Sequence, residues 1–219
     1  MAVDIFHFWS KIKPHERIHP DDREVFQRVG RKGHGLDLRC LPACFGGRLR
    51  TASVVLLFLS PGFSARDLKD ARTSDGRARY AKRRTGRQSV SENSSWFQSR
   101  IKAFGLDFKD VSAKIAILNI GAYHSKQFTD YPLLAALPSS RVSLDWAQNV
   151  LFPKAIRGER IVICLRSAHF WGLNAGKKYG RSLFAPHVTR GGHMRKKTPA
   201  EKKMRNAIIR AVRKAIQNN

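Results

Sequence analysis

Three apolar runs of strand length divide the chain, at residues 52–59, 114–120 and 160–165. Each run is continuous rather than alternating, which is typical of strands that are buried on both faces. Segments with helical character separate the runs. The pattern therefore predicts an α/β fold in which helices cover both faces of a mostly parallel sheet.

Helical patterns occupy most of the intervals between these runs. We expect helices within residues 3–11, from His19-Pro20-Asp21-Asp22 onward, and within 63–72, 96–104 and 141–153. Two basic segments differ in character. Residues 30–35 are rich in glycine and are expected to form a loop, and the polar residues 73–95 are expected to form a mobile loop.

A basic amphipathic helix is predicted at residues 198–219. Thr198-Pro199-Ala200-Glu201 has the form of a capping box with proline at the first helical position. Lys and Arg cover one face of this helix, and an apolar stripe follows the other face at Met204, Ile208, Ala211, Val212, Ala215 and Ile216. We divide the chain into one α/β domain at 1–197, with N-terminal helices in 1–35, and this C-terminal helix.

The charge of the chain indicates a polyanionic partner. Its 219 residues suit one domain, and 42 Lys and Arg against 16 Asp and Glu leave a net charge of +26. Such a chain repels itself unless it meets a polyanion, and DNA or RNA are the obvious ones. An anionic membrane surface is the rival, although no apolar run is long enough to span a bilayer.

The three cysteines and the N-terminus bear on location and cofactors. Cys40, Cys44 and Cys164 form no disulfide framework, and no basic stretch precedes an apolar run at the N-terminus. We therefore expect a cytoplasmic protein. Cys40 and Cys44 lack further soft ligands nearby, so we expect no metal and no other cofactor.

Polar side chains gather where the apolar runs end. The segments 60–64, 119–125 and 166–171 each follow a run, and a fourth segment, 184–193, is also rich in groups that bind polar ligands. Because the ligand crevice of an open α/β sheet lies at the carboxyl ends of its strands, these segments predict one site.

Three motifs resemble the uracil-DNA glycosylase superfamily. Residues 41–47 and the run that follows lead into Ser60-Pro61-Gly62-Phe63-Ser64, where the family has a strand followed by a G-x-N-P-G or G-Q-D-P-Y-H turn. Leu118-Asn119 resembles the second strand end, whose Asn reads the base edge. Pro186-His187-Val188-Thr189 resembles the last, proline-containing loop. The similarity spans about residues 41–193.

The resemblance implies a central, mostly parallel four-stranded sheet flanked by helices on both faces. It also implies a monomeric, monofunctional glycosylase that flips a base out of DNA, hydrolyses its N-glycosidic bond and leaves an abasic site, without a metal. The catalytic residues implied are Ser60, Asp67, Asn119 and His187. Those that would bind the base are Gly62, Phe63, Asn119, Tyr123 and His124. Those that would contact the DNA backbone are Ser64, Ser125, Arg166, Ser167, Thr189, Arg190 and His193.

Two departures from the family pattern bear on the substrate. Ser60 stands where the family usually has the Asp or Asn that positions water. Gly62 stands where the uracil-specific branch has a Tyr that blocks substituents at carbon 5 of the base. With small Gly121 and Ala122 beside Asn119, the pocket should admit a modified pyrimidine, such as the glucosylated hydroxymethylcytosine of phage DNA, which suggests a role in phage defence. The three cysteines are too few for the iron–sulfur branch of the superfamily.

Other interpretations remain open for individual residues. Asp67 suits a helix N-terminus and Asn119 a turn, whereas Phe63 and Tyr80 could stack on the base or pack in the core. The arginines of 77–87 suit either a solvated surface or the DNA backbone.

Other functions also remain open. The chain could be a uracil or mismatch repair glycosylase, a non-catalytic nucleic-acid-binding protein, or an RNase that uses His124 and His187 as acid and base. The C-terminal helix could dock on the domain, contact phosphate or lie on a membrane surface.

Overall fold

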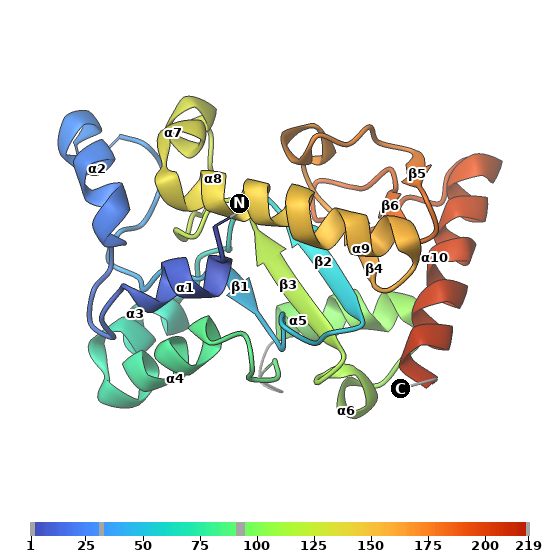
Figure 1. Cartoon of the computed structure of the whole chain (residues 1–219), viewed down its shortest axis with the longest axis horizontal. Coiled ribbons are helices and arrows are strands. Elements are labelled where there is room, and N and C mark those ends of the chain that lie inside the picture. The colour runs from blue at the N-terminus through green and yellow to red at the C-terminus, as the bar shows by residue number, and fades with distance from the viewer. Residues whose placement is uncertain (1–2, 31–32, 91–94, 218–219) are drawn as a thin grey trace.

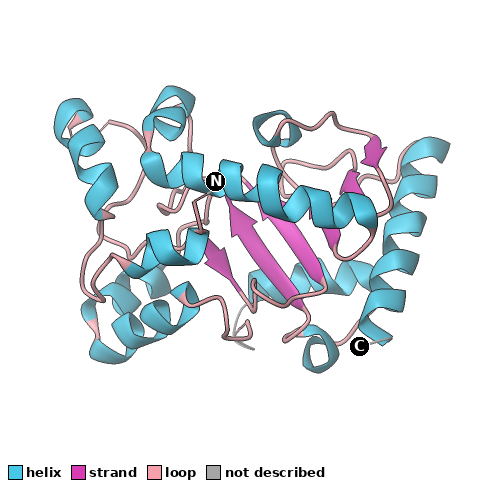
Figure 2. Cartoon of the chain, viewed as in Figure 1, coloured by secondary structure: helices cyan, strands magenta, loops and turns pink. Residues whose placement is uncertain are grey.

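The computed structural model describes residues 3–30, 33–90 and 95–217. It is an α/β structure in which helices flank a mixed, six-stranded sheet (Figures 1 and 2). The strand order is β1-β3-β2-β4-β6-β5. The strands are β1 (Phe45–Gly46), β2 (Val54–Phe58), β3 (Ile115–Asn119), β4 (Ile161–Cys164), β5 (Lys177–Tyr179) and β6 (Leu183–Ala185).

The inner strands β3, β2, β4 and β6 are parallel to one another, and β1 and β5 pair antiparallel at the two edges. The prediction of four strands is therefore wrong. Both edge strands were missed because β1 has two residues and β5 three, which is too short for a hydrophobic period to emerge. The parallel inner strands end at the same edge of the sheet, with Phe58 of β2 opposite Asn119 of β3.

The alternation of side chains along β2 explains why its sequence is apolar throughout. Val55 and Leu57 join a core cluster with helices α1 (Ile5–Ser10), α8 (Pro138–Trp146) and α9 (Phe152–Arg157). Val54, Leu56 and Phe58 join a second cluster on the other face, with α5 (Ser95–Ile101) and α10 (Pro199–Gln217). In Figure 1, α1, α8 and α9 lie in front of the sheet, and α5 lies behind it. Both faces are covered, as the continuous apolar runs predicted.

The remaining helices surround this sandwich. They are α2 (Arg23–Val29), α3 (Ala65–Arg72), α4 (Ser74–Arg84), α6 (Phe108–Val111) and α7 (Tyr131–Ala136), with short 3-10 turns at Pro20–Asp22, Lys102–Phe104 and Ala168–Trp171. A π-helical turn, Ala147–Leu151, joins α8 to α9, so the helix expected within 141–153 is part of a longer helical segment. Trp146 and Trp171 are core residues.

The structure corrects the prediction of a mobile loop at 73–95, because α4 occupies the first part of it. Thr73 caps this helix, since its Oγ1 accepts a hydrogen bond from Gly76 N at 3.2 Å. Gly76 lets α4 approach α3 closely, because a Cβ there would lie 2.1 Å from the carbonyl oxygen of Asp70. Residues 91–94 of this stretch, and residues 31–32 of the glycine-rich loop, lie outside the described residues.

Helix α10 begins as the sequence predicted and packs its apolar stripe on the sheet. Thr198 N donates to the Glu201 carboxylate at 3.1 Å, and Glu201 N donates to Thr198 Oγ1 at 3.2 Å, which completes the capping box. Ile208, Val212 and Ile216 are buried in the same cluster as β2 and β4. Within the described ranges, no helix combines the length and the apolar character needed to cross a membrane.

Candidate active site

A cavity of about 500 Å³ lies at the carboxyl ends of β2 and β3 and extends towards α3, α4 and α5. It brings together a large part of the site that the sequence predicted: Ser60, Gly62, Phe63, Ser64, Asp67, Asn119 and His124. Tyr80, a candidate to stack on the base, and Arg83, one of the arginines of 77–87, also line this cavity. The sequence analysis did not place the remaining polar and aromatic lining side chains here: Phe45, Arg66, Asp70 and Trp96.

Backbone hydrogen bonds join the two loops that form the rim of this cavity. Gly121 N donates to Leu59 O at 2.8 Å, which continues the pairing of β2 and β3 beyond their ends. Ser125 N then donates to Pro61 O at 3.1 Å, and Ser125 forms an isolated parallel bridge with Gly62. The loops after both strands are therefore held together, and they fix the side chains between them.

Asp67 is held in place by three hydrogen bonds in the first turn of α3. Its Oδ2 accepts from Ser64 N at 2.8 Å, which is part of a capping box between the two residues, and from Ser64 Oγ at 2.7 Å. Its Oδ1 accepts from the Tyr80 hydroxyl at 3.0 Å. A carboxylate oxygen offers about two acceptor positions, so Oδ1 retains one for a ligand or a water. Asp67 is thus both a helix N-terminal acid and a residue of the cavity.

His124 connects the strand-end loops to Asp67 and Tyr80. Its Nδ1 lies 2.7 Å from the carbonyl oxygen of Gly62, which can only accept, so Nδ1 carries the proton. The same nitrogen lies 3.5 Å from Asp67 Oδ2, and Nε2 lies 3.4 Å from the Tyr80 hydroxyl. Burial, and then the nearby negative charge of Asp67, raise the pKa of Tyr80, so this residue stays a neutral hydroxyl. Asp67, Tyr80 and His124 form one polar network, in which the single hydroxyl proton of Tyr80 is donated to Asp67 and the Tyr80 oxygen faces Nε2 of His124.

Asn119 presents a fixed amide to the cavity. Its backbone N donates to Cys44 O at 2.8 Å, and its side-chain Nδ2 donates to Ala43 O at 3.0 Å. No other hydrogen bond holds this side chain within the described part of the chain, so one N–H and Oδ1 remain as an adjacent donor and acceptor. A side-chain amide with a free donor and a free acceptor is a group that can pair with the edge of a nucleobase.

Two glycines leave space in the cavity, and two other small residues serve packing. A Cβ built on Gly62 or on Gly46 would have no heavy atom within 4 Å. By contrast, a Cβ on Gly121 would lie 2.7 Å from Leu134 Cδ1, and Ala122 is fully buried in the core. Gly62 therefore opens the cavity as expected, whereas Gly121 and Ala122 are small because the protein packs against them.

Tyr123 and Ser125 lie outside the lining of this cavity. The Tyr123 hydroxyl donates to Asp22 Oδ2 at 2.5 Å and accepts from His19 N at 3.1 Å. Its ring packs edge-on against Phe26 at a centroid distance of 5.0 Å. Tyr123, expected to bind the base, is therefore part of the core that holds the N-terminal segment to the domain. The hydroxyl of Ser125 is buried and has no hydrogen-bond partner in the described structure.

The residues expected to contact the DNA backbone after β4 and β6 lie beside the cavity rather than in its lining. Thr189 N donates to His193 O at 2.8 Å and closes a turn that also contains Arg190. Arg100 donates to Gly191 O in this turn and lies 4.9 Å from the ring centroid of Trp96, which lines the cavity. Arg166 is exposed at the end of β4, and Ser167 next to it has a left-handed φ of 55°.

His187 lies against Gly176 and lines neither this cavity nor the larger groove described below. Its expected catalytic role therefore has no support from its position. The RNase interpretation needs His187 and His124 in one site, and only His124 lines the cavity.

No family model, curated protein or solved structure matches this chain. The superfamily resemblance consequently rests on the motifs at 59–64, 118–119 and 186–189 and on the site around them.

The cysteines are free, buried thiols. Burial raises the pKa of Cys40, Cys44 and Cys164 to about 12 in each case. Cys44 Sγ lies 3.2 Å from Ser143 Oγ, in the core rather than in the cavity. The described residues include no cluster of three His, Cys, Asp or Glu that could hold a metal ion.

Proposed function

We propose that this chain is a DNA glycosylase that binds one flipped nucleotide in the cavity at the ends of β2 and β3. The observation that carries the proposal is the joint presence in this cavity of the Asn119 amide and the Asp67–Tyr80–His124 network. An enzyme that acts on a base must take it out of the stack and read its hydrogen-bonding edge in a pocket. The net charge of +26 supplies affinity for the DNA backbone.

Asn119 recognises the base edge in this proposal. Because Ala43 O fixes one N–H of the amide, the second N–H and Oδ1 address the base in a set order. For a cytosine derivative, the N–H donates to ring N3 and Oδ1 accepts from the exocyclic amino group. Uracil presents the reverse order, an acceptor at O4 and a donor at N3–H, so an amide held in one order distinguishes these two bases. Asn119 thus selects a pyrimidine edge, and the space around the base decides which substituents fit.

The reaction breaks the bond between C1′ of the sugar and the base nitrogen, and the electron pair of that bond leaves with the base. Asp67 supplies the negative charge that stabilises the sugar cation, and Tyr80 and Ser64 hold its carboxylate in place. Water adds at C1′, its proton neutralises the departing base anion, and an abasic site remains. Ser60, at the family's water position, contributes a hydroxyl that orients the water without taking its proton.

The substrate in this proposal is a pyrimidine with a bulky group at carbon 5. The open space beside Gly62 accepts such a group, where a tyrosine would exclude it. Glucosylated hydroxymethylcytosine, which marks some phage genomes, fits this description, and its removal would act in phage defence.

The test is an excision assay on oligonucleotides that contain uracil, a G·T mismatch, hydroxymethylcytosine or glucosylated hydroxymethylcytosine, with abasic sites revealed by alkali. We expect cleavage at the modified cytosine. Gly62→Tyr should abolish excision of the glucosylated base, while Gly62→Ala, its matched control, should retain it.

Two outcomes would count against this proposal in different ways. If the protein excises only uracil and Gly62→Tyr does not change that activity, the substrate is not a pyrimidine with a bulky group, and the chain is a uracil repair enzyme. Tight DNA binding without excision of any base would favour a non-catalytic binding protein. The serine at position 60 and the occupied Oδ2 of Asp67 are the observations that favour that alternative.

A further inference from the structure

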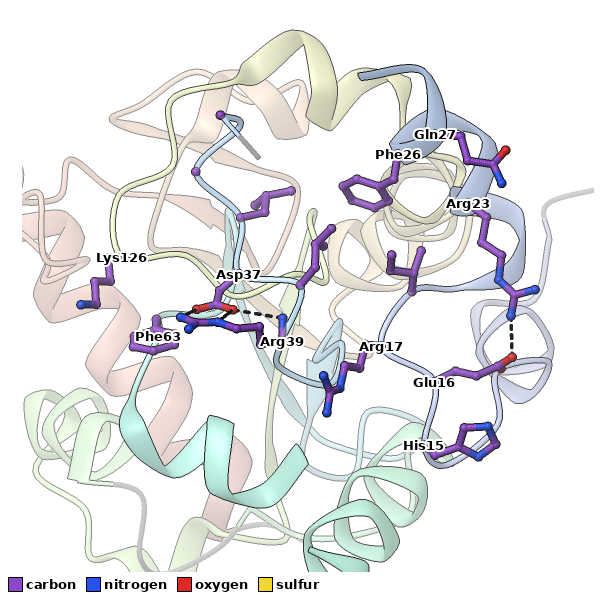
Figure 3. A pocket seen from close by; sticks show the side chains of 15 residues that line it. His15, Glu16, Arg17, Arg23, Phe26, Gln27, Asp37, Arg39, Phe63 and Lys126 are labelled. Atoms are coloured by element: carbon purple, nitrogen blue, oxygen red, sulfur yellow. Dashed lines mark hydrogen bonds and ion pairs between the residues drawn. The ribbon is translucent and has the colours of Figure 1, made fainter. Parts of the chain in front are cut away.

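A groove of about 1040 Å³ adjoins the base cavity, and Phe63 lines both. Its walls come mainly from residues 15–18, 23–27 and 33–39, which lie outside the part of the chain that resembles glycosylases. In Figure 3 the labelled side chains extend from Lys126 and Phe63 at one end, past Asp37 and Arg39, to Arg17 and then Glu16. The groove therefore continues from the mouth of the cavity across the N-terminal region.

The groove and the cavity share the loop after β3. Asp37 N donates to the carbonyl oxygen of His124 at 2.7 Å, so the groove wall is bonded directly to a cavity residue. Lys126, two residues further along this loop, has its ammonium 5.2 Å from the centroid of the Phe63 ring. A strand that leaves the cavity past Phe63 would meet Lys126 and Arg39 next.

Positive charge predominates in the groove. Arg23 pairs with Glu16 at 2.5 Å, and Arg39 pairs with Asp37 at 2.7 Å, so the acids of the groove are neutralised by these two arginines. Arg17 and Lys126 are exposed and form no ion pair with any described residue. The groove thus holds one cation without a counter-ion beside an aromatic ring, Lys126, and a second further along, Arg17. Cations that contact phosphates and an aromatic ring that stacks on a base are the groups with which proteins bind single-stranded nucleic acids.

We propose that this groove binds the unpaired DNA strand that flanks the flipped nucleotide. Arg17 and Lys126 contact phosphates, and Phe63 stacks on the base next to the flipped one. This inference rests on the proposed function, because the cavity must hold the nucleotide from which the strand continues. It makes the substrate a single strand, or a duplex opened on one side of the target base.

The test measures binding of an unmodified single-stranded oligonucleotide by fluorescence anisotropy at a series of salt concentrations. Each phosphate contact on a single strand contributes roughly 0.7 to the slope of log affinity against log salt. The Arg17→Gln/Lys126→Gln variant should therefore bind more weakly, with a slope shallower by about 1.4. Lys109→Gln is the matched control, because exposed Lys109 lies on α6, at the other end of β3 from the cavity (Figure 1).

Three results would overturn the inference. One is a slope for the double variant equal to that of Lys109→Gln. Another is a slope change that occurs with duplex DNA and not with the single strand. The third is an excision rate that is the same for a target base with a long or a very short single-stranded flank.

Failure of the groove and failure of the proposed function are distinguishable. If the protein excises a base at a rate that depends neither on the length of the flank nor on the two substitutions, the groove proposal is rejected and the glycosylase proposal stands. If the Arg17→Gln/Lys126→Gln variant has the shallower slope but the unmodified protein excises no base, the groove remains a site for single-stranded DNA and the glycosylase proposal is rejected. Melting temperatures of the variants, expected to equal that of the unmodified protein, check that the exposed substitutions leave the fold intact.

Discussion

At the scale of single residues, Tyr80 is the connection on which the cavity network depends. Its buried hydroxyl is the only group in the described structure that bonds Asp67 Oδ1 and approaches His124 Nε2. Without this hydroxyl, Asp67 retains its hydrogen bonds to Ser64, and Nε2 of His124 loses its contact with Tyr80. Tyr80 therefore acts as a positioning residue, since it orients the groups that contact the substrate.

We expect Tyr80→Phe to slow excision with little effect on DNA binding. A hydrogen bond to a charged group contributes about 1.5–3 kcal/mol, which corresponds to roughly a ten- to hundredfold change in rate. Single-turnover excision would measure this loss. Tyr179→Phe is the control, because it removes a hydroxyl that accepts a hydrogen bond from Asn174 N and lies on the far edge strand. Equal rates for the two variants would contradict the role assigned to Tyr80.

A second prediction concerns Asp22 and the dependence of folding stability on pH. This carboxyl is fully buried and bonds Tyr123 and Ser139 N. Burial raises its pKa above the ordinary value of 3.8, because desolvation outweighs those hydrogen bonds. The folded protein therefore holds this proton more tightly than the unfolded chain does. The stabilisation is complete below pH 3.8 and declines as the pH rises through the folded pKa.

Asp22→Asn replaces the neutral carboxyl with a group of the same shape that does not titrate. We expect the melting temperature of the variant, relative to the unmodified protein, to improve as the pH rises from 3.8 through the folded pKa of Asp22, and then to level off. Thermal melts at a series of pH values measure this difference. Two curves that stay parallel across the range would show that Asp22 has the same pKa in the folded and unfolded states.

At the scale of elements, the three inner strands with long apolar runs were predictable from the sequence. Burial on both faces forces β2, β3 and β4 to be apolar throughout, so hydrophobicity alone reveals them. Helix α4 was not predictable in this way. It buries few residues, namely Gly76, Tyr80 and Arg84, and its arginines resemble a solvated loop, although arginine favours helices.

The difference between strands that stand out as apolar runs and helices without such a signal also explains which parts of the site were predictable. Ser60, Gly62 and Asn119 follow apolar runs, and the rule that sites lie at strand ends finds them. Arg83 and Trp96 reach the cavity from α4 and α5, through packing between elements distant in sequence. The same rule was misleading for Tyr123, because the chain has left the strand there and the side chain packs in the core against Phe26.

Helix α10 docks on the sheet through its apolar stripe, so those side chains are engaged in the core. Ile208 is fully buried there, and its truncation should leave a cavity. We expect Ile208→Ala to lower the free energy of unfolding by about 2–5 kcal/mol. Arg210→Ala, on the exposed face of the same helix, should have little effect. Urea denaturation of both variants measures the difference, and equal midpoints would show that α10 does not contribute to the cooperative core.

At the scale of the whole molecule, the buried stripe of α10 disfavours the membrane interpretation. A helix on a membrane surface inserts its apolar face, and Ile208, Val212 and Ile216 are already packed against the sheet. The basic face of α10 remains available. Lys203, Arg210 and Lys214 are exposed at helical spacing and form no ion pair within the described chain. Phosphates are the anions that such a stripe fits.

A net charge of +26 attracts DNA whatever the positions of the charged residues on the surface. A specific contribution of the basic face of α10 must therefore be distinguished from this general attraction. Changing Lys203, Arg210 and Lys214 to Gln removes three charges from one face. Changing Lys13, Lys109 and Arg141, all exposed, removes three charges from scattered positions and leaves the same net charge. If α10 contacts phosphates, only the first variant should lose slope in a plot of log affinity for duplex DNA against log salt, by about 0.9 per contact. Because phosphates carry no sequence information, the loss should be the same for DNA of any sequence. If both variants lose slope equally, the charge acts diffusely, and the site-specific contacts belong to the cavity and the groove alone.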